Sequence, residues 1–144
     1  MSSPTQHALE YGVPISLELA KRVMAAAEAE ALAHHWPVVI AIVDSGGHLV
    51  MLHRFDHTQY GSLTIARLKA ETALNFKRPT KAFEETLAGA GPGLKVLSMP
   101  GVTPLEGGIP LIQAGKIIGA IGVSGVLSAE DAQVANAGAA ALND

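Results

Sequence analysis

The sequence predicts a single α+β domain built around one antiparallel sheet. Two short segments rich in β-branched residues each double back at a glycine-containing turn, and helical patterns precede, separate and follow them. Breaks at Pro79 and Gly89 delimit the helices between the hairpins, so the order is helix, hairpin, two helices, hairpin, helix. At 144 residues the chain has the length of one domain, and we expect both hairpins to share one sheet.

The first helix is predicted to begin at Ser16, whose hydroxyl can cap it, and to end before Pro37. An apolar stripe repeats along it at helical spacing and consists of Ala20, Met24, Ala27 and Ala31. The first hairpin follows. Residues 38–43 are typical of a strand buried on both faces, residues 44–47 of a turn whose glycines accept positive φ, and residues 48–55 of the returning strand.

Two helices are predicted between the hairpins. Ser62 is expected to cap the first of them and Thr80 the second, which is short and is followed by a turn-rich loop at residues 89–93. Arg67 and Glu71 are four residues apart and are expected to pair on the solvent side. The longer helix shows a bulky face and, beside it, a narrower alanine stripe that permits close packing; these consist of Ile65, Leu68, Thr72 and Phe76, and of Ala66, Ala70 and Ala73.

The second hairpin is predicted from residues 109–113 and Lys116–Ser124, which flank a turn at Ala114 and Gly115. Strict alternation would place the bulky residues of the last strand on one face and small residues on the other, leaving space for a helix or a ligand. The two sets are Ile117, Ile121 and Val123, and Ile118, Ala120, Gly122 and Ser124. Ser128 followed by Asp131 resembles a capping box for the closing helix.

Composition and charge exclude several classes of protein. The net charge of -3 argues against nucleic-acid binding and against a polybasic membrane surface, and the lack of cysteine excludes disulfides and thiolate sites. No apolar run approaches the ~20 residues of a membrane-spanning helix. Residues 1–10 show no secretory signal, so we expect a cytoplasmic protein. Residues 1–14 are expected to form a partly ordered N-terminal extension.

The chain is apolar for its size. Hydrophobic residues make up 49% of it and the mean hydropathy is +0.30, with alanine-rich helix faces. A domain this small cannot readily bury so much apolar surface alone. We therefore expect a homo-oligomer, a dimer or larger.

The six histidines do not show the spacing of a metal site, and we expect no dedicated metal ion. His34 and His35 are adjacent, so on a helix they would point about 100° apart. Haem needs only one or two protein donors, which leaves a histidine as axial ligand open. Residues 119–125 are glycine-rich but lack the patterns of a P-loop or a dinucleotide fold, so no nucleotide cofactor is expected.

Polar residues near the predicted element ends are candidate ligand-binding groups, namely Arg54, Lys69, Thr103, Glu106, Gly107 and Gly108. We expect them to surround one pocket between the second helix and the loop of residues 100–110. Lys69 can extend along its helix and place its ammonium over the glycines, where it would bind a ligand carboxylate. The alternative interpretation is a surface ion pair of Arg54 with Asp56 or Glu106 that has no function.

Several ordered motifs resemble the GlcG/HbpS-like family, also called the haem-degrading domain family. The resemblance covers the chain from about Ile15 to Leu142. The segments that carry it are residues 37–49 and 54–56 for the first hairpin, residues 69–73 with Phe76 and Thr80 for the central helix, and residues 107–111 and 119–125 for the second hairpin.

The resemblance implies a curved antiparallel sheet with helices packed on it, assembly into oligomers, and haem as a possible cofactor. In one branch a threonine in the loop before the second hairpin is implicated in holding haem, and Thr103 occupies that loop. Another branch uses a histidine near the end of the first helix, to which His34 or His35 would correspond. Glu84 and Glu85 are adjacent, unlike the Glu-x-x-Glu iron motif of the sensor branch, so that role is not implied.

Three hypotheses follow. The first is a small-molecule-binding protein for haem or another tetrapyrrole. The second is a cofactor-independent catabolic enzyme acting on a small anionic hydroxy- or oxo-acid, in which Arg54 or Lys69 anchors the carboxylate and His53 or Glu106 moves a proton. The third is a structural partner of an enzyme encoded in the same operon.

Overall fold

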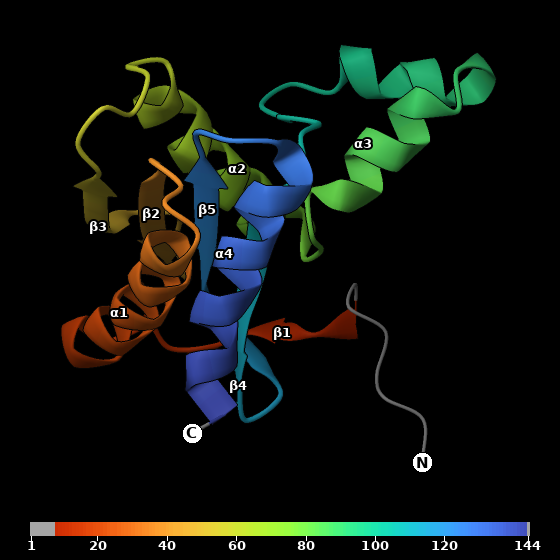
Figure 1. Cartoon of the computed structure of the whole chain (residues 1–144). Helices are drawn as coiled ribbons and strands as arrows, with labels where there is room; N and C mark the ends of the chain where they lie inside the picture. Colours follow the sequence, from red (N-terminus) through yellow and green to blue (C-terminus); the bar gives the residue numbers. More distant parts are fainter. Residues whose placement is uncertain (1–7, 144) are drawn as a thin grey trace.

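The computed structural model describes residues 8–143, which fold into a five-stranded sheet covered by helices on both faces (Figure 1). The strands are β1 (Glu10–Tyr11), β2 (Val39–Asp44), β3 (Leu49–Arg54), β4 (Gly108–Gln113) and β5 (Lys116–Ser124). The α-helices are α1 (Leu17–Ala33), α2 (Ser62–Phe76), α3 (Lys81–Ala88) and α4 (Ser128–Ala140). Two 3₁₀ helices are η2 (Gly91–Ser98) and η3 (Ala141–Asn143).

The two predicted hairpins share one sheet, which confirms the α+β prediction. Strand β5 is central: β2 pairs antiparallel with one edge of it, β4 with the other, and β3 pairs with β2. The sheet is not purely antiparallel, because β1 pairs parallel with the start of β5, with Glu10 opposite Lys116. This short strand lies in the expected N-terminal extension, of which residues 1–7 lie outside the described residues.

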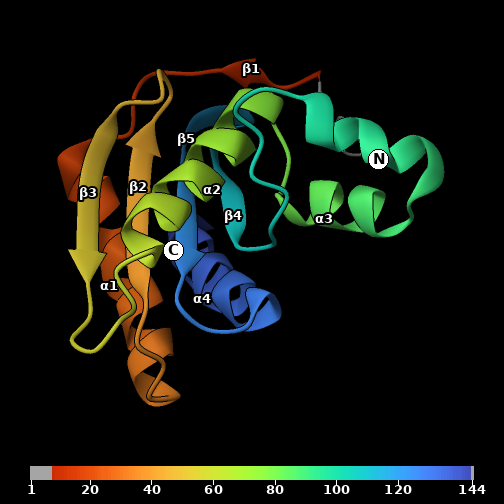
Figure 2. The same cartoon turned by 90° about the horizontal axis from the view of Figure 1, so that it is seen from above.

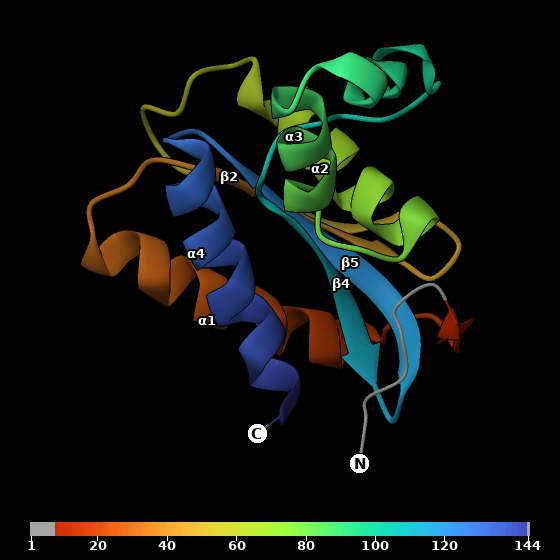
Figure 3. The ribbon, with the colours of Figure 1, turned by 90° about the vertical axis from the view of Figure 1, so that its right-hand side faces the viewer.

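The helices form one layer on each face of the sheet (Figures 2 and 3). On one face α1 and α4 pack side by side, and the predicted stripe that includes Ala20 and Ala27 is buried there against Ile121 and Val134. On the other face α2 lies across the middle of the sheet. None of the helices in residues 8–143 is long and apolar enough to cross a lipid bilayer.

The buried face of α2 is the alanine stripe, and the bulky face is not the main core face. Ala66 and Ala70 are fully buried, whereas Ile65 and Leu68 remain half-exposed. The reason is the closeness of helix and sheet: a Cβ at Gly122 of β5 would lie only 2.0 Å from the carbonyl oxygen of Ala66. The small-residue face of the last strand therefore accommodates a helix and leaves no space for a ligand.

A β-bulge in β5 changes which residues share a face. Leu111 of β4 pairs with Gly119 and its neighbour Ile112 with Ile117, so Ile118 is the extra residue. Ile118 consequently packs with Ile121 on the side of α1 and α4, while Ile117 packs on the side of α2. The predicted strict alternation is wrong at these two positions, because a bulge shifts the period by one residue.

Among the predicted helix caps, the side-chain hydrogen bond is confirmed for Ser16, whose hydroxyl accepts from the N–H of Leu19. Ser62 lies inside α2, where it is buried and hydrogen-bonded to Ser124 of β5. Thr80 is the N-cap residue of α3, as predicted, but its hydroxyl does not cap the helix, because it accepts a hydrogen bond from the N–H of Gly108 instead.

The start of α4 also differs from the predicted capping box. The N-cap residue is Leu127, and the carboxylate of Glu130 accepts a hydrogen bond from its N–H at 3.2 Å. Ser128 and Asp131 do not form a box, because Asp131 is buried and its carboxylate is used elsewhere.

The segment after α3 departs from the expected loop. Residues 91–98 form the 3₁₀ helix η2, which packs beside α3 at the margin of the domain (Figure 2). Leu94 and Leu97 of η2 are exposed, so this α3–η2 arm presents apolar side chains that the rest of the chain does not cover.

Candidate functional site

The most buried charged groups of the described chain are Lys69 of α2 and Asp131 of α4, whose side chains are 2% and 3% exposed. The Lys69 Nζ lies 3.0 Å from Asp131 Oδ2 and donates a second hydrogen bond to the carbonyl of Val123 at 2.9 Å. The pair therefore joins helices on opposite faces of the sheet at the end of β5.

Asp131 is held by the backbone as well as by Lys69. Its Oδ1 accepts a hydrogen bond from the N–H of Val126 at 3.1 Å. Burial raises the pKa of Asp131, and the nearby Lys69 ammonium and the backbone N–H groups of Val126 and Gly125 oppose that rise. The loop between β5 and α4 is thus fixed by the same carboxylate that partners Lys69.

The Lys69 ammonium lies where it was predicted, but it is not available to a ligand. A Cβ at Gly107 would lie 2.9 Å from Lys69 Nζ, so the ammonium does lie against the glycine loop. However, the protein's own Asp131 occupies it, and the side chain is almost completely buried. Lys69 is therefore not a free anchor for a ligand carboxylate.

Three of the predicted site residues line one cleft, of about 180 Å³, beside this pair. They are Glu106, Gly107 and Gly108, and the remaining walls come from β4, from α3 with the residue before Thr80, and from α4: Ile109, Pro79, Lys81, Ala132 and Asn136. Within residues 8–143 the Glu106 carboxylate has no hydrogen bond or ion pair, although its N–H donates to Glu84.

Thr103 lies near this cleft along the chain but not on its wall. Its backbone N–H donates to the hydroxyl of Thr72 at 3.0 Å, and that hydroxyl donates in turn to the carbonyl of Gly101. These bonds attach the loop to α2, and Thr103 is buried against it. In the single chain, Thr103 therefore helps to hold the loop on α2 and does not line the cleft.

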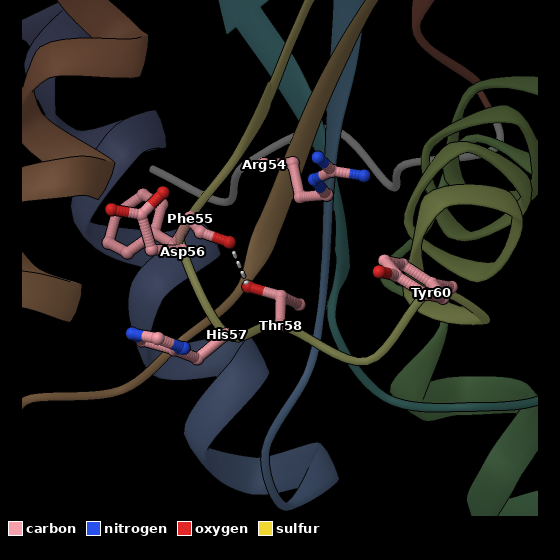
Figure 4. A pocket seen from close by; sticks show the side chains of 6 residues that line it. All are labelled: Arg54, Phe55, Asp56, His57, Thr58 and Tyr60. Carbon is pink, nitrogen blue, oxygen red and sulfur yellow. Dashed lines mark hydrogen bonds between the residues drawn. The ribbon is translucent and has the colours of Figure 1, made fainter.

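Arg54 does not join the other predicted residues and lines a separate, larger cavity of about 510 Å³. The cavity lies in the segment of residues 54–60, between the end of β3 and the start of α2, and Figure 4 shows the side chains that line it, which are all of this segment except Gln59. The Arg54 guanidinium lies over the ring of Tyr60, 5.7 Å from its centre. Both lie on the side that faces α2, and His57 lies across from them.

The loop that forms this cavity is held in shape by Thr58. The buried Thr58 hydroxyl lies 2.8 Å from the carbonyl oxygen of Phe55 (dashed in Figure 4) and 3.2 Å from that of Val38, within hydrogen-bond distance of both. His57 adopts a left-handed conformation with φ of 69°, which is uncommon for a residue other than glycine. Its exposed ring is therefore presented from a constrained backbone, and it makes no hydrogen bond within residues 8–143.

His34 and His35 lie at the end of α1, before Pro37 leads into β2. Because Val39 pairs with Arg54, this is the same end of the sheet as the residue 54–60 cavity. The His34 ring stacks on Trp36 with centres 4.3 Å apart, and its Nε2 lies 3.3 Å from the Glu30 carboxylate. His35 is exposed with φ of 58°.

The residues named for an enzyme do not assemble into one site. His53 pairs with Glu28 of α1, whereas Glu106 lines the cleft beside α3. Among residues 8–143 no cluster of three or more histidine, aspartate or glutamate side chains could hold a metal ion.

His57 and Tyr60 were not predicted as neighbours of Arg54. The three residues recur at intervals of three along one loop, a spacing that is not diagnostic in irregular structure. The signal available was the polar and aromatic composition of residues 54–60 directly after a strand.

The chain matches one protein family and is similar in sequence to a known protein. The family described as haem degrading protein HbpS-like matches residues 15–140. The protein GlcG of Escherichia coli is 42% identical over 112 residues, which span 78% of this chain and 82% of GlcG. The name GlcG does not describe an activity.

Two solved structures are similar along most of their length. The crystal structure of HbpS matches with a TM-score of 0.81 at 33% identity, covering 98% of this chain and 99% of HbpS. The crystal structure of a PduOC complex with haem matches with a TM-score of 0.81 at 30% identity, covering 91% of this chain and 96% of PduOC.

Proposed function

The chain belongs to the HbpS-like family, and we propose that it binds haem or a related tetrapyrrole in the cavity formed by residues 54–60. The observation that carries the proposal is that Arg54, His57 and Tyr60 line one cavity at the end of the sheet. The haem complex of the similar protein PduOC supports the choice of ligand class.

The side chains of the cavity fit the chemistry of this ligand class. A guanidinium such as that of Arg54 forms strong, bidentate hydrogen bonds with carboxylates and so suits a propionate. Phe55 and Tyr60 offer aromatic surface to a planar macrocycle. The volume of about 510 Å³ falls within the roughly 300–1,000 Å³ of ligand sites, whereas the cleft at Glu106 is smaller.

We propose His57 as the protein donor to the haem iron. It is the imidazole on the cavity wall, and its ring is not engaged by another described side chain. His34 already pairs with Glu30 and stacks on Trp36, which makes it a poorer donor to the haem iron. His35 is the second candidate, because it is exposed at the same end of the sheet. Bound haem would supply an iron centre whose reactivity its axial ligand sets.

The proposal includes assembly of the chain into a homo-oligomer. Large apolar side chains are exposed at the ends of the sheet and on the α3–η2 arm, among them Leu32 at 61%, Leu97 at 70% and Leu127 at 72%. Such residues gain stability when a second copy covers them. A cavity open to solvent would also be better enclosed for an apolar ligand by a neighbouring copy.

A haemin titration followed by absorbance tests the proposal. The wild-type chain is expected to give a red-shifted Soret band that saturates near one haem per chain. His57→Asn is expected to weaken binding at least about tenfold, because asparagine tolerates the left-handed backbone but does not ligate iron. Arg54→Gln is expected to weaken it as well, through loss of the propionate partner.

His48→Asn is the matched control, because His48 is an exposed imidazole at the opposite end of β3, in the β2–β3 turn. It should bind haemin like the wild type. If the wild type gives no saturable Soret change, haem binding is wrong. If binding is lost in His35→Asn and kept in His57→Asn, the donor is His35 and the assignment of His57 is wrong.

A further inference from the structure

The cleft beside the Lys69–Asp131 pair is a second, independent cavity. Its walls come from the start of α3, the middle of α4 and the loop that ends at Gly108, and it does not include any residue of the 54–60 cavity. Its volume of about 180 Å³ is about a third of the volume of the 54–60 cavity. The cleft therefore suits a smaller ligand than that cavity does.

Its polar groups carry opposite charges. Lys81 supplies an ammonium, whose nearest carboxylate partner is the exposed Glu85 at 3.7 Å. Glu106 supplies a half-buried carboxylate without a partner in residues 8–143. Asn136 donates its amide N–H to the carbonyl of Ala132, which leaves its own carbonyl oxygen as an acceptor.

The floor of the cleft is rigid and close to neutral. Gly108 is clamped between α2 and α3: a Cβ there would lie 2.3 Å from the carbonyl oxygen of Lys69 and 2.7 Å from Thr80. Its N–H is bonded to Thr80, and its carbonyl accepts from the Thr80 N–H. Below the neighbouring Gly107, the Lys69 ammonium is balanced by Asp131.

We propose that this cleft binds a small zwitterion, an α-amino acid of about the size of alanine or serine. Lys81 bonds the carboxylate of the ligand, and Glu106 and the Asn136 carbonyl accept from its ammonium. Since one ammonium and one carboxylate line a cleft whose floor is balanced, a ligand of zero net charge matches it better than an anion or a cation. The half-buried Ile109 and Ala132 offer a short apolar surface to a small side chain.

Titration of the isotope-labelled full chain with L-alanine and L-serine, followed by ¹H–¹⁵N NMR, tests this site. We expect saturable shifts centred on the amides of Gly107 and Gly108. Propionate and propylamine match alanine in size but carry one charge each, and both are expected to bind at least about tenfold more weakly.

Variants separate a charge-matched site from a non-specific one. Glu106→Gln and Lys81→Gln are each expected to weaken L-alanine binding at least about tenfold. Lys116→Gln is the control, because Lys116 is an exposed lysine paired with Glu10 at a distant turn. The inference is overturned if neither amino acid gives saturable shifts, or if Glu106→Gln binds L-alanine like the wild type.

The result is separable from the haem proposal. Glu106→Gln is expected to bind haemin like the wild type, because Glu106 does not line the 54–60 cavity. Loss of haemin binding alone leaves the amino-acid site intact, and loss of alanine binding alone leaves the haem site intact.

Discussion

The ammonium of Lys69 and the carboxylate of Asp131 lie 3.0 Å apart in the interior, 62 residues apart in sequence, and join α2 to α4. Both groups are nearly inaccessible to solvent, so neither can be rehydrated when the other is removed. Removal of one partner of such a pair typically costs about 3–5 kcal/mol of folding free energy.

Lys69→Met is therefore expected to lower the free energy of unfolding by about 3 kcal/mol or more, because it leaves the Asp131 charge buried and unpaired. Denaturant unfolding of the single variant measures this. The double variant Lys69→Met, Asp131→Leu is expected to recover most of the loss, since it removes both charges. A single variant as stable as the wild type would show that burial of Asp131 does not require Lys69 as its partner.

The close approach of α2 to β5 gives a second prediction. Gly122→Ala is expected to lower the free energy of unfolding by about 3 kcal/mol or more, because its Cβ would lie 2.0 Å from the backbone oxygen of Ala66. Gly61→Ala is the control, since a Cβ there meets nothing within 4 Å and φ is -58°. Equal melting temperatures of the two variants would contradict the packing of α2 described above.

The contribution of the turn between β2 and β3 to the stability of the fold depends on pH. Burial alone would raise the pKa of Asp44, but backbone N–H donors from His48 and Gly46, together with the nearby His48 ring, hold the pKa below its ordinary value of 3.8. Because the folded pKa is depressed, the ionised group stabilises the fold above the unfolded pKa, and this stabilisation is lost as the pH falls through the folded pKa.

Asp44→Asn is accordingly expected to be about 1 kcal/mol less stable than the wild type at pH 7, through loss of the charged acceptor. The difference should shrink as the pH falls below 3.8, where the wild-type carboxyl also becomes neutral. Urea unfolding of both proteins across this range measures it. A difference that stays constant from pH 7 down to pH 2 would rule out ionisation as its cause.

Helix capping gives a fourth prediction. Ser16→Ala is expected to cost about 1 kcal/mol, because the Ser16 hydroxyl accepts from the N–H of Leu19. Ser128→Ala should change stability by no more than about 0.5 kcal/mol, since Leu127 is the N-cap and Glu130 provides the side-chain acceptor there. Thermal unfolding of the pair tests the two assignments, and a greater loss in Ser128→Ala would reverse them.

The elements were predictable because their signals are local. The strand Lys116–Ser124, the helix start at Ser16 and the Arg67–Glu71 pair, with Nε and Oε1 3.2 Å apart, all follow from short-range patterns. The face of α2 that packs on the sheet was not predictable from the helix alone. The distance between helix and sheet decides it, and that distance depends on Gly122 in a remote strand.

The candidate site was only partly predictable for the same reason. Glu106, Gly107 and Gly108 were correctly grouped because they are consecutive in sequence. The grouping of Arg54 with them was wrong, because β3 ends on the opposite side of β2 from β5 and β4. Asp131 has the spacing of a capping residue, and nothing local in the sequence identifies it as the partner of Lys69.

The location of the bound tetrapyrrole tests the central proposal most directly. Paramagnetic line broadening of the ¹H–¹⁵N spectrum by ferric haemin, compared with the diamagnetic zinc porphyrin, reports which amides lie near the iron. We expect broadening centred on residues 54–60, strongest near His57, with the amides of Gly107 and Gly108 unaffected. Broadening centred on Gly107 and Gly108, or none at saturating haemin, would contradict a haem site at Arg54, His57 and Tyr60.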